Sequence, residues 1–306
     1  MRLCWNDWFN KRLRDIKPEE AKTIHDIGYR VAGVNSGDDE ATDDDIKRLK
    51  SIMTDYELSP GPYGAGARIF HPDPTECERH HKKLIKVLEI AGKLGCPTIR
   101  TSGGTFDLKD PWAMHQENHT QKSMDILVES TKKVIAAAED NNVIICPETT
   151  QWTIIDDVER MKEFVDRCDS PCVKVVLDVV NHMNMQRVYE SGRWMKCAIA
   201  TLGDRIGVIH VKDVQVEYKL VAHLNETKMG TGLLDHAALM RASNQLEPWK
   251  TFSLEHIAYD YTKPDHVINV TEAYNHICAV ADRIGHTFTD PTLTREKWVE
   301  MQKNNR

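Results

Sequence analysis

Three apolar runs follow one another in the middle of the chain: VIICPETT (143–150), VKVVLDVVN (173–181) and IGVIHVKD (206–213). Their apolar residues are nearly continuous rather than alternating, which is typical of parallel strands that are covered on both faces. A longer segment with helical periodicity separates each run from the next. The pattern therefore predicts successive β-then-α units.

The same alternation extends outward in both directions and occurs eight times in all. The other predicted strands are RLCW (2–5), RVAGVN (30–35), LSPGPYG (58–64), TIRTSGG (98–104) and TFSLEHI (251–257). Eight such units predict an α/β protein with a single (β/α)₈ TIM barrel, which takes about 250 residues. An open doubly wound sheet fits less well, because RLCWNDWFN (2–10) has no glycine-rich turn after the first strand. We assign the barrel to residues 1–285, with residues 286–306 as a C-terminal tail packed on the barrel or extending from it.

The composition excludes several classes of protein. The chain has 40 basic and 47 acidic residues, and a net charge of −7 does not favour binding to polyanions. No run approaches the ~20 apolar residues of a membrane span. Several of the eight cysteines lie inside apolar runs, as expected of buried thiols in a reducing compartment. We therefore expect a cytoplasmic protein that binds neither nucleic acid nor membrane.

Four consecutive predicted strands end in acids or an imidazole, at the barrel edge where active sites lie. Taken singly, each acid could cap a helix or pair with a cation, and the histidine could belong to the core. Three clustered carboxylates would instead repel one another, and a divalent ion would remove that cost. The candidate metal ligands are Glu148, Asp178, His210 and Glu255. We expect one ion, Mn²⁺ first, with Mg²⁺, Co²⁺ or Zn²⁺ as alternatives, because oxygen ligands with one imidazole suit all four.

Five motifs occur in a fixed order along the second half of the chain. They are ICPETT (145–150), SPCVKVVLDVVN (170–181), LGDRIGVIHVKD (202–213), MGTGLLD (229–235) and FSLEH (252–256). Together with HPDPTECERHHKKLIKVLEIAGKLGCPTIRT (71–101), they resemble the sugar phosphate isomerase/epimerase group of the xylose-isomerase-like barrel superfamily. The resemblance covers nearly the whole predicted barrel.

The resemblance implies that the four candidate ligands hold a metal and that Glu148 and Glu255, on opposite sides of the ion, are catalytic. These two carboxylates would move a proton at a carbon next to the carbonyl of a sugar or sugar conjugate, through an enediolate. The implied enzyme is a sugar isomerase or epimerase. Seven further residues at strand ends or in adjoining loops are candidates for binding the substrate, with a packing or surface role as the alternative for each. They are His71, Arg100, Trp112, Asn181, His182, Lys212 and His256.

Apurinic endonucleases belong to the same superfamily, but this sequence argues against that activity. Those enzymes need three zinc ions and therefore more histidines. Here Asp178 is followed by Val179, Val180 and Asn181 in place of the Asp-x-x-His of those enzymes, and the strand TIRTSGG ends without a histidine.

A lyase remains as the alternative, because removal of the same proton can end in expulsion of a β-substituent. The alternatives are a lyase that cleaves a carbon–carbon or carbon–oxygen bond of a 3-keto-glycoside, as in the α subunit of a C-glycoside deglycosidase, or a keto-inositol dehydratase. Many relatives have Pro-His after the strand-five glutamate and Arg in the glycine turn, where this chain has Thr149, Thr150 and Thr231. These changes and the long loop 214–232 are compatible with a bulkier substrate or a partner chain. We therefore expect an oligomer, of identical chains or with a small β subunit.

Overall fold

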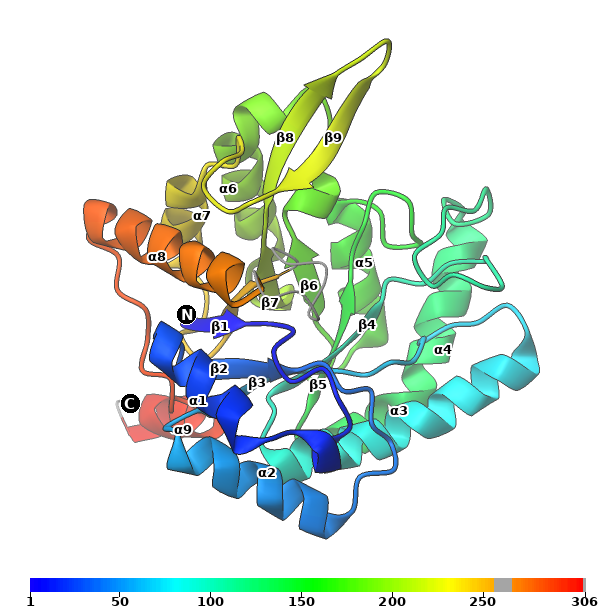
Figure 1. Cartoon of the computed structure of the whole chain (residues 1–306). Coiled ribbons are helices and arrows are strands. Elements are labelled where there is room, and N and C mark those ends of the chain that lie inside the picture. The colour runs from blue at the N-terminus through cyan, green and yellow to red at the C-terminus, as the bar shows by residue number, and fades with distance from the viewer. Residues whose placement is uncertain (256–265, 305–306) are drawn as a thin grey trace.

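The computed structural model describes residues 1–255 and 266–304. Eight parallel strands close into a barrel, and β1 pairs with both β2 and β10 to complete the ring (Figure 1). The barrel strands are β1 (Arg2–Trp5), β2 (Val31–Val34), β3 (Ser59–Gly64), β4 (Thr98–Ser102), β5 (Ile144–Glu148), β6 (Val175–Asp178), β7 (Ile206–Val211) and β10 (Thr251–Leu254). Each lies inside one of the eight predicted runs, and the prediction of a single (β/α)₈ barrel is confirmed.

Helices surround the barrel and bury their apolar faces against it (Figure 1). They are α1 (Pro18–Ile27), α2 (Asp43–Asp55), α3 (Pro74–Leu94), α4 (Gln121–Asp140), α5 (Val158–Cys168), α6 (Ser191–Leu202), α7 (His236–Ser243), α8 (His266–Ile284) and α9 (Arg295–Asn304). Short 3₁₀ segments lie at Leu13–Asp15, Val180–His182, Arg187–Glu190 and Gly203–Arg205. Thr42 begins α2 as its sequence predicts, because the Thr42 side chain and the Asp45 carboxylate each bond to the other's backbone N–H. Among the described residues, every helix is too short or too polar to cross a membrane.

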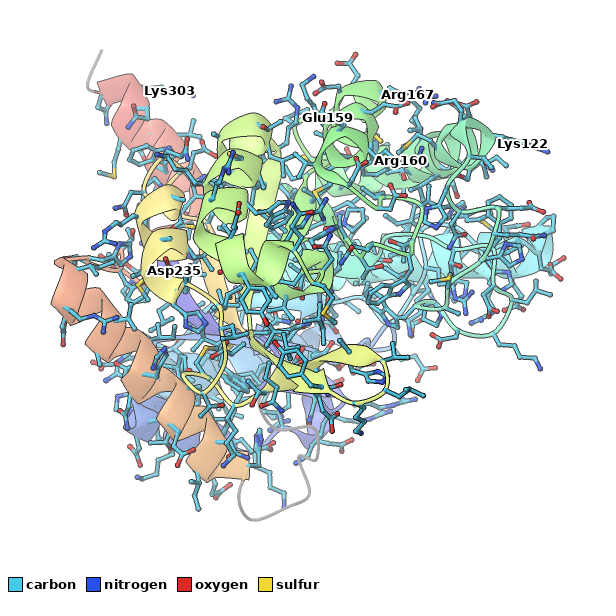
Figure 2. The ribbon with its side chains drawn as sticks, turned by 90° about the horizontal axis from the view of Figure 1, so that it is seen from above. Lys122, Glu159, Arg160, Arg167, Asp235 and Lys303 are labelled. Carbon is cyan, nitrogen blue, oxygen red and sulfur yellow. The ribbon has the colours of Figure 1, made fainter. Side chains whose placement is uncertain are left out.

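Polar contacts tie neighbouring helices of the outer ring together. Figure 2 labels Arg160 and Arg167 on α5, next to α4. Arg167 lies 2.7 Å from the Asp125 carboxylate of α4, and the Arg160 guanidinium donates to the carbonyl of Thr120 at 3.2 Å. Most of these pairs are exposed and contribute little to stability individually.

The segment that the sequence analysis treats as a loop, 214–232, contains an antiparallel hairpin that projects from the barrel (Figure 1, yellow). Its strands are β8 (Asp213–Tyr218) and β9 (Ala222–Thr227). Val214 is buried and Gln215 is exposed, and this alternation is the period-two pattern of a half-buried strand. The loop assignment is therefore wrong for most of this segment.

The described part of the tail, residues 286–304, lies against the amino-terminal end of the barrel. Trp298 of α9 and Leu293 pack against a cluster of buried residues inside that end. The cluster comprises Ile144, Cys146, Val176, Val208 and Trp249. Thr289 also bonds to the first residue, since its hydroxyl accepts from the Met1 amino group at 3.0 Å. Apolar side chains thus close this end of the barrel.

Candidate metal centre

The four candidate ligands lie together at the carboxyl end of four adjacent strands. Glu148 and Asp178 are the last residues of β5 and β6, His210 lies in β7, and Glu255 directly follows β10. Parallel register places Asp178 beside His210 and His210 beside Ser253. All four side chains are buried, and one possible ligand atom from each lies within 4.8 Å of every other. We call these four residues the metal-site cluster.

His210 faces the three carboxylates of the metal-site cluster. Its Nδ1 lies 2.8 Å from Glu255 Oε2, 3.5 Å from Glu148 Oε2 and 3.6 Å from Asp178 Oδ2. Among the described residues, neither ring nitrogen has a hydrogen-bond partner of acceptable geometry. Burial alone would lower the pKa of His210, but Glu255 and Glu148 raise that pKa well above its usual value. A cation between the imidazole and the carboxylates would take the place of this proton, so the residues present fit a divalent metal ion.

Lys212 approaches the metal-site cluster from the strand that carries His210. Its Nζ lies 2.6 Å from Asp178 Oδ2 and 3.1 Å from Glu255 Oε2. Burial acts to lower the pKa of Lys212, but Asp178 and Glu255 raise it well above its usual value. Burial likewise acts to raise the pKa of Asp178, but Lys212 and His210 lower it below the usual range. Both groups are therefore ionised at neutral pH.

Arg100 of β4 connects the cluster to the first strands of the barrel. Its NH1 lies 3.2 Å from Glu148 Oε2 and also contacts Glu255 Oε1. Its NH2 donates to Asp7 Oδ1 at 2.8 Å and to Asn35 Oδ1 at 3.0 Å. The planar guanidinium holds its donors in a fixed fork, so Arg100 orients the side chains that it contacts more rigidly than a lysine would.

The ion pairs around the metal-site cluster bring several carboxylates together. Among the described residues they join two cations, Arg100 and Lys212, to four carboxylates, Asp7, Glu148, Asp178 and Glu255. Carboxylates buried this close to one another repel unless positive charge lies between them. A divalent cation among the four candidate ligands would supply such charge.

Backbone and amide groups orient two of the ligands. The backbone N–H groups of Val180 and Asn181 both donate to Asp178 Oδ1 at 3.0 Å, which leaves Oδ2 facing the cluster. The Asn181 amide donates to Glu148 Oε1 at 3.1 Å. Ligands held in this way by neighbouring groups are pre-oriented for a metal.

A cavity of about 910 Å³ opens above the metal-site cluster. Residues of the loops after β3, β4 and β5 form its outer walls, and they include Trp112 and Trp152. The Nε1 of Trp152 donates to the Trp112 carbonyl at 2.7 Å. Gly64 in the cavity wall packs directly against Asn35, so a Cβ at this position would lie 1.9 Å from Asn35 Oδ1. A larger residue would displace the amide that Arg100 contacts.

The structure brings five of the seven predicted substrate-binding residues to this cavity. Those that line it are His71, Arg100, Trp112, Asn181 and Lys212. The backbone already occupies both ring nitrogens of His71, because Nδ1 accepts from Asp73 N and Nε2 lies 3.0 Å from the Leu108 carbonyl. His182 lies outside the cavity lining, with Nε2 2.9 Å from Thr149 Oγ1 and its ring stacked on Trp194. His256 lies outside the described residues.

Two of the positions that differ from the pattern of many relatives lie in different surroundings. Thr150 lines the cavity, whereas Thr231 is exposed in a turn, where its hydroxyl donates to the Lys228 carbonyl.

The sequence analysis missed several residues of this site. Asp7 and Asn35 line the cavity and bond to Arg100, and Arg68, Trp152 and Glu226 line it further out. Asp7 lies two residues after the first predicted strand, and Asn35 is the last residue of the second. The strand-end argument that identifies the metal-site cluster would have found both, had it been applied to every strand.

Comparisons with known proteins agree with this geometry. The model of the xylose isomerase-like TIM barrel family matches residues 21–278. An L-ribulose 3-epimerase structure superposes with a TM-score of 0.71 at 16% identity, covering 93% of this chain and 95% of that one. The apo form of a 3-keto-D-glucoside 4-epimerase from E. coli gives a TM-score of 0.66 at 14% identity, covering 92% of this chain and 98% of that one. A xylose isomerase-like protein from Mycobacterium smegmatis, in complex with magnesium, gives 0.68 at 13% identity, covering 93% of this chain and 97% of that one. No curated protein matches the chain in sequence.

Proposed function

The chain belongs to the xylose isomerase-like TIM barrel family, and from that premise we propose that it is a divalent-metal-dependent sugar isomerase or epimerase. The observation that carries the proposal is the metal-site cluster, in which four buried side chains each bring a possible ligand atom within 4.8 Å of the others. The epimerases among the structurally similar proteins act on sugars, which supports a sugar or sugar-conjugate substrate here.

The proposed reaction begins with removal of a proton from a carbon next to a carbonyl. A divalent ion held by Glu148, Asp178, His210 and Glu255 would polarise the carbonyl and stabilise the enediolate that forms when the proton leaves. Glu148 and Glu255 come from the two outer strands of the four that carry the cluster, and we assign the proton transfers to these two carboxylates. A base on each side allows a proton to leave one face of the carbon and return to the other, as an epimerisation requires.

Lys212 and Arg100 supply fixed positive charge where negative charge develops on the substrate. Each is buried or nearly so, and each contacts Glu255. Preorganised cations in a water-poor site stabilise developing charge without a cost of reorganisation. We assign Asn181, whose amide donates to Glu148, to a substrate hydroxyl, and Trp112, which lines the cavity, to the face of the sugar.

For the ion itself we propose Mn²⁺, with Mg²⁺, Co²⁺ and Zn²⁺ as alternatives. Three carboxylates with one imidazole suit all four ions. The magnesium-bound relative supports a site for a hard divalent cation in this fold.

A lyase that acts on a 3-keto-glycoside is the second candidate, and the size of the cavity favours it. At about 910 Å³ the cavity is near the upper end of the roughly 300–1,000 Å³ of sites that hold drug-sized ligands. The first step would be the same proton abstraction, and only the fate of the enediolate would differ. For either activity we propose a cytoplasmic enzyme that acts as an oligomer, in the lyase case with a small β subunit.

Hydrogen exchange in D₂O tests the proposed step. The metal-loaded enzyme should place deuterium at the carbon next to the carbonyl of its keto-sugar. Glu255→Gln keeps an oxygen ligand but removes a base, so exchange should fall by ~10²-fold or more while the metal is largely retained. Mass spectrometry of the product then separates the candidates, because an epimerase returns a sugar of unchanged mass apart from the label, whereas a lyase releases a leaving group. If no keto-sugar exchanges a proton, the proposed reaction is wrong.

A further inference from the structure

A buried arginine without an acidic partner lies in the wall of the active-site cavity. Arg68 follows β3 and exposes only 7% of its surface, yet it lines the cavity. Its NH1 donates to the backbone carbonyl of Asp107 at 2.7 Å. Within residues 1–255 and 266–304, no carboxylate lies at ion-pair distance from its guanidinium. Burial lowers the pKa of Arg68, but an arginine stays protonated in proteins.

An uncompensated buried guanidinium calls for an anion. Removing a charged group from water costs several kcal/mol unless a counter-charge is present. Every other buried or nearly buried cation of this site has one, since Arg100 contacts Asp7 and Glu148, and Lys212 contacts Asp178. Arg68 is the exception among the described cavity residues, and it faces space that a ligand could fill.

Donors and positive charges lie next to Arg68, while the nearby Asp107 and Asp110 carboxylates stay beyond ion-pair distance of its guanidinium. The backbone N–H of Arg68 approaches His80 Nδ1 at 3.4 Å, which leaves Nε2 of His80 to carry the ring proton and act as a donor. Burial, together with the nearby cations Arg79 and Arg68, lowers the pKa of His80 to about 4, so His80 is a neutral donor at pH 7. Glu76, which also lines the cavity, is already bound by Arg79 through Nε and NH2, at 2.9 and 2.7 Å.

The same cavity extends from this wall to the metal-site cluster. Its lining includes Glu148 and Lys212 at the inner end and Arg68 and His80 at the outer end. Between them runs the segment Gly64–Ala67, whose small side chains leave the passage open. One ligand molecule could therefore reach both ends.

We propose that Arg68 and His80 form an anion-binding subsite that holds a phosphate or carboxylate group of the substrate, away from its reacting carbon. The inference deepens the proposed function and rests on it, because it makes the substrate an anionic keto-sugar rather than a neutral one. The planar guanidinium suits either anion through two parallel hydrogen bonds. The subsite fixes the position of the substrate chain and thereby which carbon faces Glu148 and Glu255.

Binding of inorganic phosphate and of malonate tests the subsite without any turnover. Calorimetric titrations at constant ionic strength would compare the metal-loaded wild type, Arg68→Met and Arg68→Lys, with Arg79→Met as the matched control. Arg79 lines the same cavity, but its guanidinium is paired with Glu76. We expect the Kd of at least one of the two anions to rise by about tenfold to a hundredfold in Arg68→Met and by less in Arg68→Lys, and to stay within about twofold in Arg79→Met. Equal affinity in Arg68→Met and wild type would overturn the proposal.

Thermal unfolding without added anion separates the subsite from a structural role. Arg68→Met removes a buried charge that lacks a counter-ion, so the variant should melt at the wild-type temperature or higher. A lower melting temperature together with unchanged phosphate and malonate affinity would show that Arg68 serves only to hold the Asp107 carbonyl, and the proposal would fail.

The last arm compares a neutral ketohexose, its 6-phosphate and its 6-carboxylate as substrates for exchange in D₂O. One of the two anionic sugars should exceed the neutral sugar in kcat/KM by about tenfold or more, with the preference lost in Arg68→Met. Which one does so distinguishes a phosphate from a carboxylate. Equal rates for all three sugars would overturn the subsite and leave the proposed function intact. If none exchanges, the proposed function fails, and the phosphate and malonate titrations alone decide on the subsite.

Discussion

The two ends of the barrel bury charged side chains in opposite ways. At the amino-terminal end, Lys174 and Lys250 are buried, and their ammonium groups bind the Asp204 carboxylate at 2.7 and 2.8 Å. Lys250 also lies 3.2 Å from Glu247, and the buried Arg2 guanidinium donates to the backbone carbonyls of Trp249 and Pro291. At the carboxyl-terminal end, three buried carboxylates gather around the imidazole of His210.

The comparison separates what stabilises the barrel from what the barrel does. At the amino-terminal end, cations bond to carboxylates or backbone carbonyls, and Trp298 covers an apolar cluster. At the carboxyl-terminal end, the clustered carboxylates fit the divalent cation that we propose. In (β/α)₈ barrels, residues that serve function commonly lie at the carboxyl-terminal end, and residues that serve stability lie at the amino-terminal end. Substitutions at the carboxyl-terminal end should therefore reduce metal binding or activity, whereas substitutions at the amino-terminal end should reduce stability.

The largest difference should appear in metal content. Asp178→Ala removes a fully buried ligand, so the bound divalent ion should fall from about one equivalent per chain to background. Asp204→Ala, at the opposite end, should leave the metal content unchanged. Elemental analysis after dialysis measures both. Equal metal content in the two variants would contradict the assignment of the site, and three zinc ions per chain would favour the nuclease that the sequence argues against.

Removal of one cation from each end gives the next largest effect. Lys212→Met should lower proton exchange by ~10²-fold, because Lys212 supplies fixed charge next to Asp178 and Glu255. The same change removes a positive charge that lies beside Asp178 and Glu255, so a divalent ion should bind at least as tightly. Lys250→Met should lower the melting temperature but leave exchange by the folded enzyme unchanged. Loss of the metal from Lys212→Met would contradict this role of Lys212.

Chelation should destabilise only one end. A ligand present at about 100 times its Kd adds ~2.7 kcal/mol to the free energy of unfolding, so a strong chelator should lower the melting temperature by about 5–10 °C. Trp298→Ala, which uncovers the apolar cluster at the other end, should lower it by a few degrees both with and without the metal. Identical melting of the wild type with and without chelator would mean that the metal site does not form.

The smallest effect concerns pH at the amino-terminal end. Burial acts to raise the pKa of Asp204, but Lys174 and Lys250 lower it below its usual value. A carboxyl group with a lowered folded pKa stabilises the protein above its unfolded pKa of about 4, and this contribution disappears as pH falls through the folded value. Asp204→Asn should therefore melt a few degrees below the wild type at pH 7, a modest change because the Asp204 side chain is 70% exposed. Scanning calorimetry should show the difference between the two proteins shrinking as the pH falls below about 4, and a constant difference at all pH values would exclude an ionic contribution.

The fold and the metal-site cluster could be predicted because both depend on strands. Each apolar run became a strand, and a residue at the carboxyl end of a barrel strand faces one common centre whatever the loops do. The hairpin at 213–227 was missed although Val214 and Val216 alternate with polar residues. Two valines are too few to distinguish a strand from a loop by periodicity alone.

Residues in loops could not be placed from the sequence, because their direction depends on local backbone geometry. His182 follows Asp178 closely, but the 3₁₀ segment Val180–His182 turns its ring toward Trp194. His71 lines the cavity, yet its nitrogens bond to the backbone. Arg68 resembles any surface arginine in the sequence, and only its burial without a carboxylate reveals it.

The pairing of β1 with β10 also determines when the protein can finish folding. Arg2 lies beside Thr251, so the ring cannot close until almost the whole chain is available, and such distant contacts slow folding. During synthesis from the amino terminus, an incomplete barrel presents two unpaired strand edges, which are prone to aggregate. Glu255 follows the strand that closes the ring. The last strand to be synthesised therefore both closes the barrel and brings in the final candidate ligand. A cation that needs all four ligands would bind only molecules that have finished folding.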